Sequence, residues 1–478
     1  MIFNIIIQNP LIMTLPEAFI DDCKTHLPSA ELEAFIHALS ESEPAISLRY
    51  NRAKYEGMEG QPIGWNPQDG AYLSQRPNFT LDPLIHAGCY YVQEASSQFV
   101  THVLRTLVKE PVVALDLCAA PGGKSTAMLS TLPEGSQLVS NEIDRRRARI
   151  LSENITKWGM PNVSVTCNTP SDFRKLTHFF DLILTDVPCS GEGMFRKDEG
   201  AVRDWSPRKV EECVTRQKEI LETIWPTLKP GGILIYSTCT FNVHEDEEML
   251  QYICEELGAE ALDIPVNPSW NIHPPLVGNL PCYRFMPHYT RGEGLFLAAV
   301  RKEQNDNESA RLGKKDNKKK GNAKLSGGAD KHKPSIDIKK ATADLLNQLD
   351  CEASIVLTAD GTLRAIPTDH RKIYDSLVEQ GLYLLQSGIE MGIIKGRDII
   401  PAHALALSAV RKDSAFPTVE LDLDSALNYL RHEAILLEAT TPTGYVIVTY
   451  QGHALGFVKN LGNRSNNMYP QEWRIRYL

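Results

Sequence analysis

The chain has 478 residues, of which 42% are hydrophobic, and this content excludes an intrinsically disordered protein. The formal net charge of −10 excludes a uniformly basic nucleic-acid binder, although it leaves room for local basic patches. The length predicts more than one domain.

Ten cysteines occur without a Cys-x-x-Cys pair and without a cysteine–histidine spacing typical of a metal site. The sequence therefore predicts neither a zinc site nor a disulfide framework, and we expect a reduced, cytoplasmic compartment. The apolar segment 1–7 lacks the basic region of a signal peptide and the length of a spanning helix. We expect a local strand there, or residues upstream of an alternative start at Met13.

The first part of the chain predicts a small α+β unit. Apolar residues recur at helical spacing over 14–43, which indicates two short helices. Segment 46–51 alternates like a strand, and segment 86–97 is typical of a strand that leads into a helix.

Two sets of side chains in this unit have open roles. The first set either contacts phosphate or forms a solvated edge, and it comprises Arg49, Arg52 and Lys54. The second set either borders a cofactor or packs at a domain joint, and it comprises Tyr90, Tyr91 and Gln93.

From residue 112 onward, strands and helices alternate, which predicts a doubly wound parallel sheet of the α/β class. Strands are expected at 112–118, 137–143, 163–167, 181–187 and 232–239, and helices at 124–132, 144–158, 208–228 and 244–257. Segment 283–302 predicts two antiparallel strands that close this sheet.

The segment 303–335 is rich in lysine and almost free of apolar residues, so it predicts a disordered linker that could also touch RNA phosphates. Globular spacing returns after it, and the last sixty residues predict short strands with glycine turns, as in a small barrel. Basic residues at this end suit an RNA-reading module, with a stabilising appendage as the alternative: Lys459, Arg464, Arg474 and Arg476.

Residues 112–126 pass from an apolar strand that ends at Asp116 into a small-residue turn and a helix. An open parallel sheet binds ligands beyond the carboxyl ends of its strands, where glycines let backbone N–H groups approach. A phosphate-binding P-loop needs glycine where Cys118 stands, and a dinucleotide site needs Gly-x-Gly-x-x-Gly. S-adenosylmethionine remains, with Glu142 at the end of the next strand as the ribose ligand, while a plain turn is the alternative.

Two later strand ends carry cysteines. Segment 180–191 ends in Asp-Val-Pro-Cys-Ser-Gly, and segment 232–240 ends in Ser-Thr-Cys-Thr. Because parallel strands end at one edge of a sheet, Asp186, Cys189 and Cys239 are expected to meet in one crevice. This favours covalent chemistry, against the alternative that the cysteines are buried as small hydrophobic residues.

Three motifs together carry a family resemblance: Cys-Ala-Ala-Pro-Gly-Gly-Lys (118–124), Asp-Val-Pro-Cys-Ser-Gly (186–191) and Ser-Thr-Cys-Thr (237–240). Over residues 86–302 the chain resembles the NOL1/NOP2/Sun family of RNA cytosine-C5 methyltransferases. The tail resembles the PUA-like domain of the bacterial RsmF subgroup. The resemblance implies a Rossmann-like class I methyltransferase domain, S-adenosylmethionine as methyl donor without a metal, and RNA, most of all 16S rRNA of the small ribosomal subunit, as partner.

The chemistry of the reaction gives the cysteines their expected roles. C5 of cytosine is a weak nucleophile, so a thiolate must first add to C6. Local sequence does not assign this role, since Pro-Cys also resembles the nucleophile motif of DNA cytosine methyltransferases. The resemblance implies that Cys239 attacks, that Cys189 assists release, and that Asp186 holds the cytosine edge and borders the cofactor. The expected cofactor-binding residues are Cys118, Ala119, Ala120, Pro121, Gly122, Gly123, Lys124, Glu142 and Asp186.

Many family members carry an aspartate near the adenine after the third strand, where this chain has Asn168 and Thr169. Asn168 or a shifted Asp172 is the expected substitute. The base to be methylated must be single-stranded or flipped out of its helix. Phosphate contacts are expected beside the Pro-Cys loop, and the run after Glu142 is expected to be a solvated face. The first group comprises Arg196, Lys197 and Arg203, and the second comprises Arg145, Arg146, Arg147 and Arg149.

The sequence thus predicts four segments: an N-terminal α+β RNA-binding unit (1–95), a methyltransferase domain (96–302), a basic linker (303–335) and a C-terminal region with a PUA-like end (336–478). The alternatives are a transfer RNA methyltransferase, a non-catalytic ribosome-assembly factor with a relict methyltransferase fold, and a P-loop nucleotide hydrolase. No membrane partner and no obligate protein partner is expected.

Overall fold

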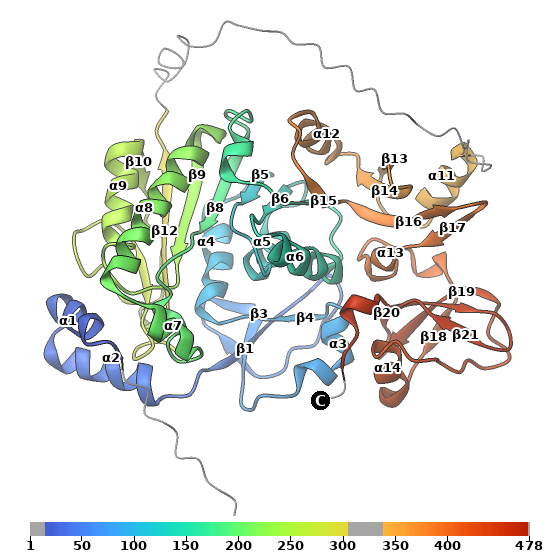
Figure 1. The fold of residues 1–478 in the computed structure, drawn as a ribbon, viewed down its shortest axis with the longest axis horizontal. Helices are drawn as coiled ribbons and strands as arrows, with labels where there is room; N and C mark the ends of the chain where they lie inside the picture. Colours follow the sequence, from blue (N-terminus) through green and yellow to red (C-terminus); the bar gives the residue numbers. More distant parts are fainter. Residues whose placement is uncertain (1–14, 305–337, 477–478) are drawn as a thin grey trace, which may run out of the picture.

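The computed structural model describes residues 15–304 and 338–476 (Figure 1). The predictions for segment 1–7 and Met13, and nearly all of the predicted linker, lie outside these residues. Within the described ranges, no helix is both long enough and apolar enough to cross a membrane.

The N-terminal part consists of two helices and a four-stranded sheet of order β2-β3-β1-β4. Both helices and the strand predicted at 46–51 are confirmed. The helices pack through Phe19 and Phe35 against aromatic residues in the loops that follow two strands of the central sheet. The elements are α1 (Glu17–His26), α2 (Ser29–Glu41), β1 (Ile46–Tyr50), β2 (Gln61–Ile63), β3 (Asn66–Leu73), α3 (Pro83–His86) and β4 (Tyr90–Val92).

The central sheet has nine strands, and its main path runs β10-β12-β9-β8-β5-β6-β7-β15, with β11 paired to β12. Strands β5 to β9 are parallel, as predicted, and β12 closes the sheet in antiparallel orientation. The strands are β5 (Val113–Asp116), β6 (Gln137–Asn141), β7 (Val163–Thr166), β8 (Phe180–Asp186), β9 (Leu228–Thr238), β10 (Ala259–Ala261), β11 (Tyr283–Phe285) and β12 (Leu295–Lys302).

Helices cover both faces of this sheet. One face packs against α4 (Phe99–Leu107), α5 (Gly123–Thr131) and α6 (Arg145–Trp158), and the other packs against α8 (Pro207–Ile224) and α9 (Glu247–Leu257). A short helix, α7 (Glu199–Asp204), precedes α8 and was not predicted. From β5 the sheet continues through β6 and β7 on one side and through β8 and β9 on the other. The strand order therefore changes direction at β5, and a ligand crevice is expected at its carboxyl end.

The ninth strand of this sheet comes from the C-terminal region and was not predicted. Strand β15 (Leu384–Ser387) pairs antiparallel with β7, and α12 (Arg371–Glu379) joins the helical layer of α8 and α9. Beneath this contact, Ser164 Oγ lies 2.8 Å from His370 Nε2 and 2.6 Å from Ser387 Oγ.

The rest of the C-terminal region holds two four-stranded sheets, of order β13-β14-β16-β17 and β18-β19-β20-β21. The second contains the predicted short strands with glycine turns and shares one core with the N-terminal sheet, so these two sheets pack side by side (Figure 1). The elements are α11 (Ile338–Leu346), β13 (Ala353–Leu357), β14 (Thr362–Pro367), β16 (Ile389–Lys395), β17 (Asp398–Pro401), α13 (His403–Leu407), β18 (Thr418–Glu420), α14 (Leu423–Leu430), β19 (Gly444–Tyr450), β20 (His453–Asn460) and β21 (Ser465–Asn467).

Three buried histidines lie where the C-terminal region meets the rest of the chain. His86 Nδ1 contacts the Tyr469 hydroxyl at 3.3 Å, and the His403 ring packs between Tyr469 and Trp473. Burial lowers the pKa of His86 and His370 to about 4 and that of His403 to about 3. All three are therefore neutral at neutral pH.

We expect the protein to lose stability as the pH falls from about 6.5 to about 4. In this window the unfolded chain binds protons that the folded His370 does not bind, so this residue alone costs about 3 kcal/mol at most. Chemical unfolding followed across this pH range measures the loss. His370→Gln keeps polar partners for Ser164 and should weaken the pH dependence, and an unchanged dependence in that variant would contradict the assignment.

Candidate active site

The turn after β5 is built for close approach to a ligand. Gly122 has φ +114°, which favours glycine, and a Cβ at this position would lie 3.2 Å from the Leu151 side chain. Helix α5 begins at Gly123, and the first N–H groups of a helix have no partner within it. They give the crevice a partial positive charge.

Arg49 supports this turn from below. Its fully buried guanidinium donates to Gln93 Oε1 (2.7 Å), to Gly123 O (3.2 Å) and to Thr126 O (3.3 Å). Both sequence interpretations of Arg49 were therefore wrong, since it neither contacts phosphate nor lies on a solvated edge. It ties the N-terminal sheet to the first turn of α5.

The second open set of residues divides between its two predicted roles. Tyr91 and Gln93 contact the turn, because a Cβ on Gly123 would lie 3.4 Å from both side chains. Tyr90 instead donates from its hydroxyl to Asp82 Oδ2 (2.6 Å) and packs in the core shared by the two ends of the chain.

Two buried carboxylates flank the turn and keep oxygen atoms without a hydrogen bond. Glu142 Oε1 accepts from Asp144 N (3.0 Å), whereas Oε2 lies 3.2 Å from the Arg147 guanidinium without accepting a hydrogen bond. Asp116 Oδ2 accepts from Ser125 Oγ (2.6 Å), and Oδ1 has no partner. Burial raises the pKa of Asp116 to about 7. Unpartnered buried acceptors fit a ligand that brings hydroxyl donors.

The two motif cysteines meet in this crevice. Cys189 Sγ lies 3.3 Å from Cys239 Sγ, and Lys124 Nζ lies 2.8 Å from Asp186 Oδ2. Ser237 Oγ donates to the other oxygen of Asp186 at 2.8 Å. The sequence prediction that one crevice holds Asp186, Cys189 and Cys239 agrees with this geometry.

The charges around the thiols favour one protonation pattern. The contact with Cys239, together with burial, holds the pKa of Cys189 well above its ordinary value, so the proton stays on Cys189. Burial lowers the pKa of Lys124, but the Asp186 carboxylate outweighs burial and leaves that pKa above its ordinary value. Lys124 is therefore a cation that interacts electrostatically with Cys239.

Buried carboxylates position the two cysteine loops, and sequence reasoning missed them. Glu245 accepts from Ser190 N (3.0 Å), Gln217 Nε2 (2.7 Å) and Asn242 Nδ2 (2.9 Å). Ser190 follows Cys189, so the carboxylate fixes the backbone beside that thiol. Burial raises the pKa of Glu245. The only sequence signal is the acidic run at 245–248, which is also typical of a solvated helix start.

Glu192 also joins the two loops. It accepts from Trp205 Nε1 (2.9 Å) and Phe241 N (2.7 Å), and Gly193 N donates to Cys239 O at 2.8 Å. Neutral donors surround both carboxylates, so each loop depends on hydrogen bonds to the other.

The substitutes for the adenine-contacting aspartate already have partners. Asn168 Nδ2 donates to Tyr383 O (3.2 Å), and Asn168 Oδ1 accepts from Tyr383 N (3.0 Å). Asp172 Oδ2 accepts from Thr169 N and Oγ1, both at 2.8 Å. The C-terminal region therefore touches this rim of the crevice.

The basic residues beside the Pro-Cys loop differ from the expectation in one case. Arg196 is buried and paired with Glu293 (3.2 Å), so its predicted phosphate contact was wrong. Lys197 is half-exposed beside the same carboxylate, whereas Arg203 is exposed. In the other run, Arg147 donates to Ala120 O at 2.7 Å and so braces the turn.

No metal site accompanies these residues in the described part of the chain, where no cluster of three or more His, Cys, Asp or Glu side chains could hold a metal ion. All ten cysteines are free thiols.

Comparison with known proteins identifies the family. Residues 104–301 match the family model "16S rRNA methyltransferase RsmB/F", residues 15–95 match "N-terminal domain of 16S rRNA methyltransferase RsmF", and residues 416–475 match "Methyltransferase RsmF PUA domain". Ribosomal RNA small subunit methyltransferase F of Aeromonas salmonicida is 31% identical over 451 residues, which cover 89% of this chain and 90% of that protein. The chain belongs to the RsmB/F family.

As a member of this family, the chain is an S-adenosylmethionine-dependent RNA methyltransferase. The relative from Escherichia fergusonii, which carries the same name, is 29% identical over 96% of both chains. NSun6 from Pyrococcus horikoshii, solved with the S-adenosylmethionine analogue SFG, aligns with 62% of this chain and all of its own length at a TM-score of 0.53 and 19% identity. That likeness shows the fold of the methyltransferase domain.

Glu245→Gln should lower the free energy of unfolding by about 2 to 4 kcal/mol, because the new amide places a donor among three donors in a buried site. Denaturant titration measures the change. Glu248→Gln is the matched control on the exposed side of α9, where we expect a change below about 0.5 kcal/mol. Equal effects in the two variants would contradict a bracing role for Glu245.

Proposed function

We propose that this enzyme methylates C5 of a cytosine in 16S rRNA through a covalent bond between Cys239 and C6 of the base. The observation that carries the proposal is the pair of thiols 3.3 Å apart beside the Lys124–Asp186 ion pair, at the carboxyl ends of the central strands. The names of the curated relatives support small-subunit rRNA as the substrate.

The cofactor fits the turn and its flanking carboxylates. The turn residues, from Cys118 to Lys124, would hold S-adenosylmethionine against the start of α5, and the unpartnered Glu142 Oε2 would accept from a ribose hydroxyl. Asp186 would border the cofactor as well. The cofactor supplies an electrophilic methyl group on a positively charged sulfur.

Cys239 is the proposed nucleophile. The Lys124 ammonium and the Cys189 S–H both stabilise negative charge on Cys239 Sγ. Addition of this thiolate to C6 would move electron density to C5, where the methyl group is accepted. The Asp186 carboxylate would accept a hydrogen bond from the exocyclic amine of the cytosine, and from N3 once the adduct is protonated there.

Cys189 is the proposed release group. After methylation, solvent water would take the C5 proton, the electron pair of the C5–H bond would restore the C5–C6 double bond, and the bond between C6 and Cys239 Sγ would break. A proton held on Cys189 Sγ lies close enough to stabilise the departing thiolate. Loss of Cys189 would therefore slow release more than addition.

We propose that residues 1–95 and 336–478 are RNA-binding units on either side of a catalytic domain at 96–302. The enzyme is proposed to act in the cytoplasm. The shared core of the two flanking parts supports one continuous binding face. Exposed Arg203 and Arg464 would contact phosphates. Bisulfite sequencing after incubation with 16S rRNA, small subunits or transfer RNA separates the substrates, and label in transfer RNA alone would overturn the rRNA proposal.

Cys239→Ala should abolish both methylation and covalent RNA attachment, because no sulfur then reaches C6. Cys189→Ala should accumulate a protein–RNA adduct that survives denaturation, because addition continues while release fails. Denaturing gels with labelled 16S rRNA measure both. If the two variants exchanged these behaviours, the two cysteines would have the opposite roles.

Glu142→Gln should weaken S-adenosylmethionine binding by about 10- to 100-fold, because a charged acceptor contributes more to a ribose hydrogen bond than an amide. Isothermal titration measures the affinity. The control is Glu134→Gln, an exposed carboxylate between α5 and β6, which should bind the cofactor as the parent protein does. Unchanged affinity in Glu142→Gln would remove this residue from the site.

A further inference from the structure

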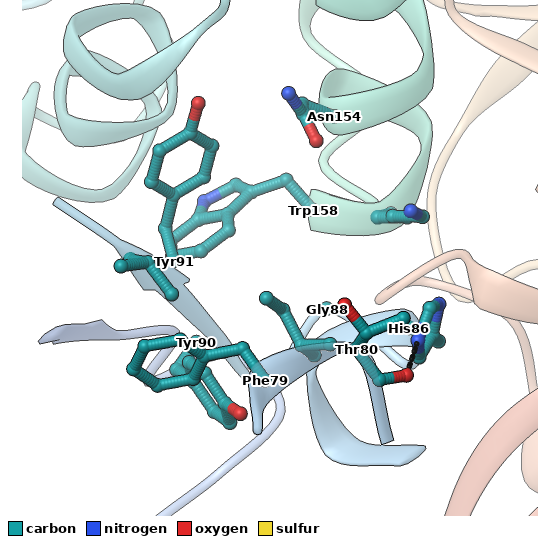
Figure 2. A pocket seen from close by; sticks show the side chains of 11 residues that line it. Phe79, Thr80, His86, Gly88, Tyr90, Tyr91, Asn154 and Trp158 are labelled. Carbon is teal, nitrogen blue, oxygen red and sulfur yellow. Dashed lines mark hydrogen bonds between the residues drawn. The ribbon is translucent and has the colours of Figure 1, made fainter. Parts of the chain in front are cut away.

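A second cavity lies outside the cysteine crevice (Figure 2). It has a volume of about 320 Å³ and opens between the N-terminal sheet and the last turns of α6. This volume lies within the range of pockets that hold small ligands, ~300 to 1,000 Å³. None of the cysteines, and neither Lys124 nor Asp186, lines it.

The rings of Phe79, Tyr90, Tyr91 and Trp158 line the cavity. Tyr91, Trp158 and Asn154 lie in the upper part of Figure 2, and Phe79 and Tyr90 lie in the lower part. Planar side chains around a cavity of this size favour a planar ligand, because the partly exposed rings of Phe79 and Tyr91 offer stacking faces.

Trp158 is held rigidly before any ligand arrives. Its Nε1 donates to Ser130 Oγ at 3.1 Å, and the Arg49 guanidinium lies 4.4 Å from the ring centroid. Because Trp158 is almost fully buried, it forms a fixed part of the cavity wall and not a stacking face.

The charge of the lining matches nucleic acid. No carboxylate lines the cavity, whereas Lys157 does, with its ammonium paired to Glu153 at 2.6 Å. Arg76 is exposed and lies 5.6 Å from the Phe79 ring centroid. The larger groove of about 700 Å³ between α1 and α8 differs, because four carboxylates line it and would repel phosphate: Asp21, Asp22, Glu211 and Glu248.

Polar groups at the upper end can read the edge of a base. Asn154 Nδ2 donates to Pro121 O at 2.8 Å, and Oδ1 accepts no hydrogen bond from the described residues. The Tyr91 hydroxyl likewise has no hydrogen-bond partner among the described residues, and burial raises its pKa to about 12, so it remains a donor. A neighbouring donor and acceptor suit the hydrogen-bonding edge of an unpaired base.

We propose that this cavity binds one unpaired base of the RNA substrate, a different base from the cytosine that is methylated. The proposal rests on the proposed function in that RNA is the substrate. The rings provide stacking, Asn154 and Tyr91 contact the base edge, and Arg76 lies near the sugar–phosphate backbone. The cavity therefore selects RNA that carries a second accessible base in addition to the target.

The test combines abasic substitution with a protein variant. A series of oligoribonucleotides is made in which each member lacks one base. The series spans the methylated cytosine or, if no RNA is methylated, the 16S rRNA fragment that binds most tightly. With the parent protein, one abasic position other than the target should weaken binding by roughly 5- to 100-fold in fluorescence anisotropy. Phe79→Leu should weaken binding of intact RNA and should abolish the additional loss at that position. Tyr374→Leu on α12, remote from the cavity, is the control, and this variant should still bind the abasic RNA more weakly than the intact RNA.

A second variant guards against misfolding of the first. Val92→Phe adds bulk to the lining without removing a ring, so it should block the cavity and abolish the same abasic effect. The proposal is overturned if no abasic position outside the target weakens binding, or if its effect persists in both variants. Cofactor titration and methylation are measured in parallel, so an abasic effect without methylation would reject the proposed function and leave the cavity assignment standing.

Discussion

The parallel register of β8 and β9 is the constraint on which the site depends. It places Asp186 opposite Ser237, so the residues that follow each strand leave the sheet side by side. Cys189 lies three residues after Asp186 and Cys239 lies two residues after Ser237, and their sulfurs are 3.3 Å apart. A shift of one residue in this pairing would turn every side chain of one strand to the other face. The thiol contact therefore depends on the register of these two strands.

Buried carboxylates hold the loops beyond these strands in place. Glu192 and Glu245 bond to both loops, so neither cysteine can move without breaking hydrogen bonds to a desolvated charge. Such groups are costly to leave unpaired. This arrangement fixes the spacing of the two sulfurs. It costs free energy of folding, because burying two carboxylates is itself unfavourable.

Sequence patterns predicted the strands, the helices and the meeting of the motif residues because those features depend on local spacing and on where parallel strands end. The same patterns failed for Arg49 and Arg196, because a sequence pattern does not show whether a guanidinium lies in solvent or among carbonyls and carboxylates. They also missed β15, because pairing with β7 depends on a segment far along the chain. The carboxylates of the cysteine loops were missed for the same reason, as their partners are brought together only by the fold.

The late pairing of β15 with β7 affects how the protein folds while it is being synthesised. About 200 residues separate the two strands, so at 5 to 20 residues per second the edge of β7 waits roughly 10 to 40 s on the ribosome before its partner is made. During that time Val163 and Val165 belong to an uncapped strand, which is a template for pairing with other nascent chains. Slow synthesis, or translation of many copies on one messenger, should therefore favour aggregation of this chain more than that of a methyltransferase whose sheet is complete within one contiguous segment.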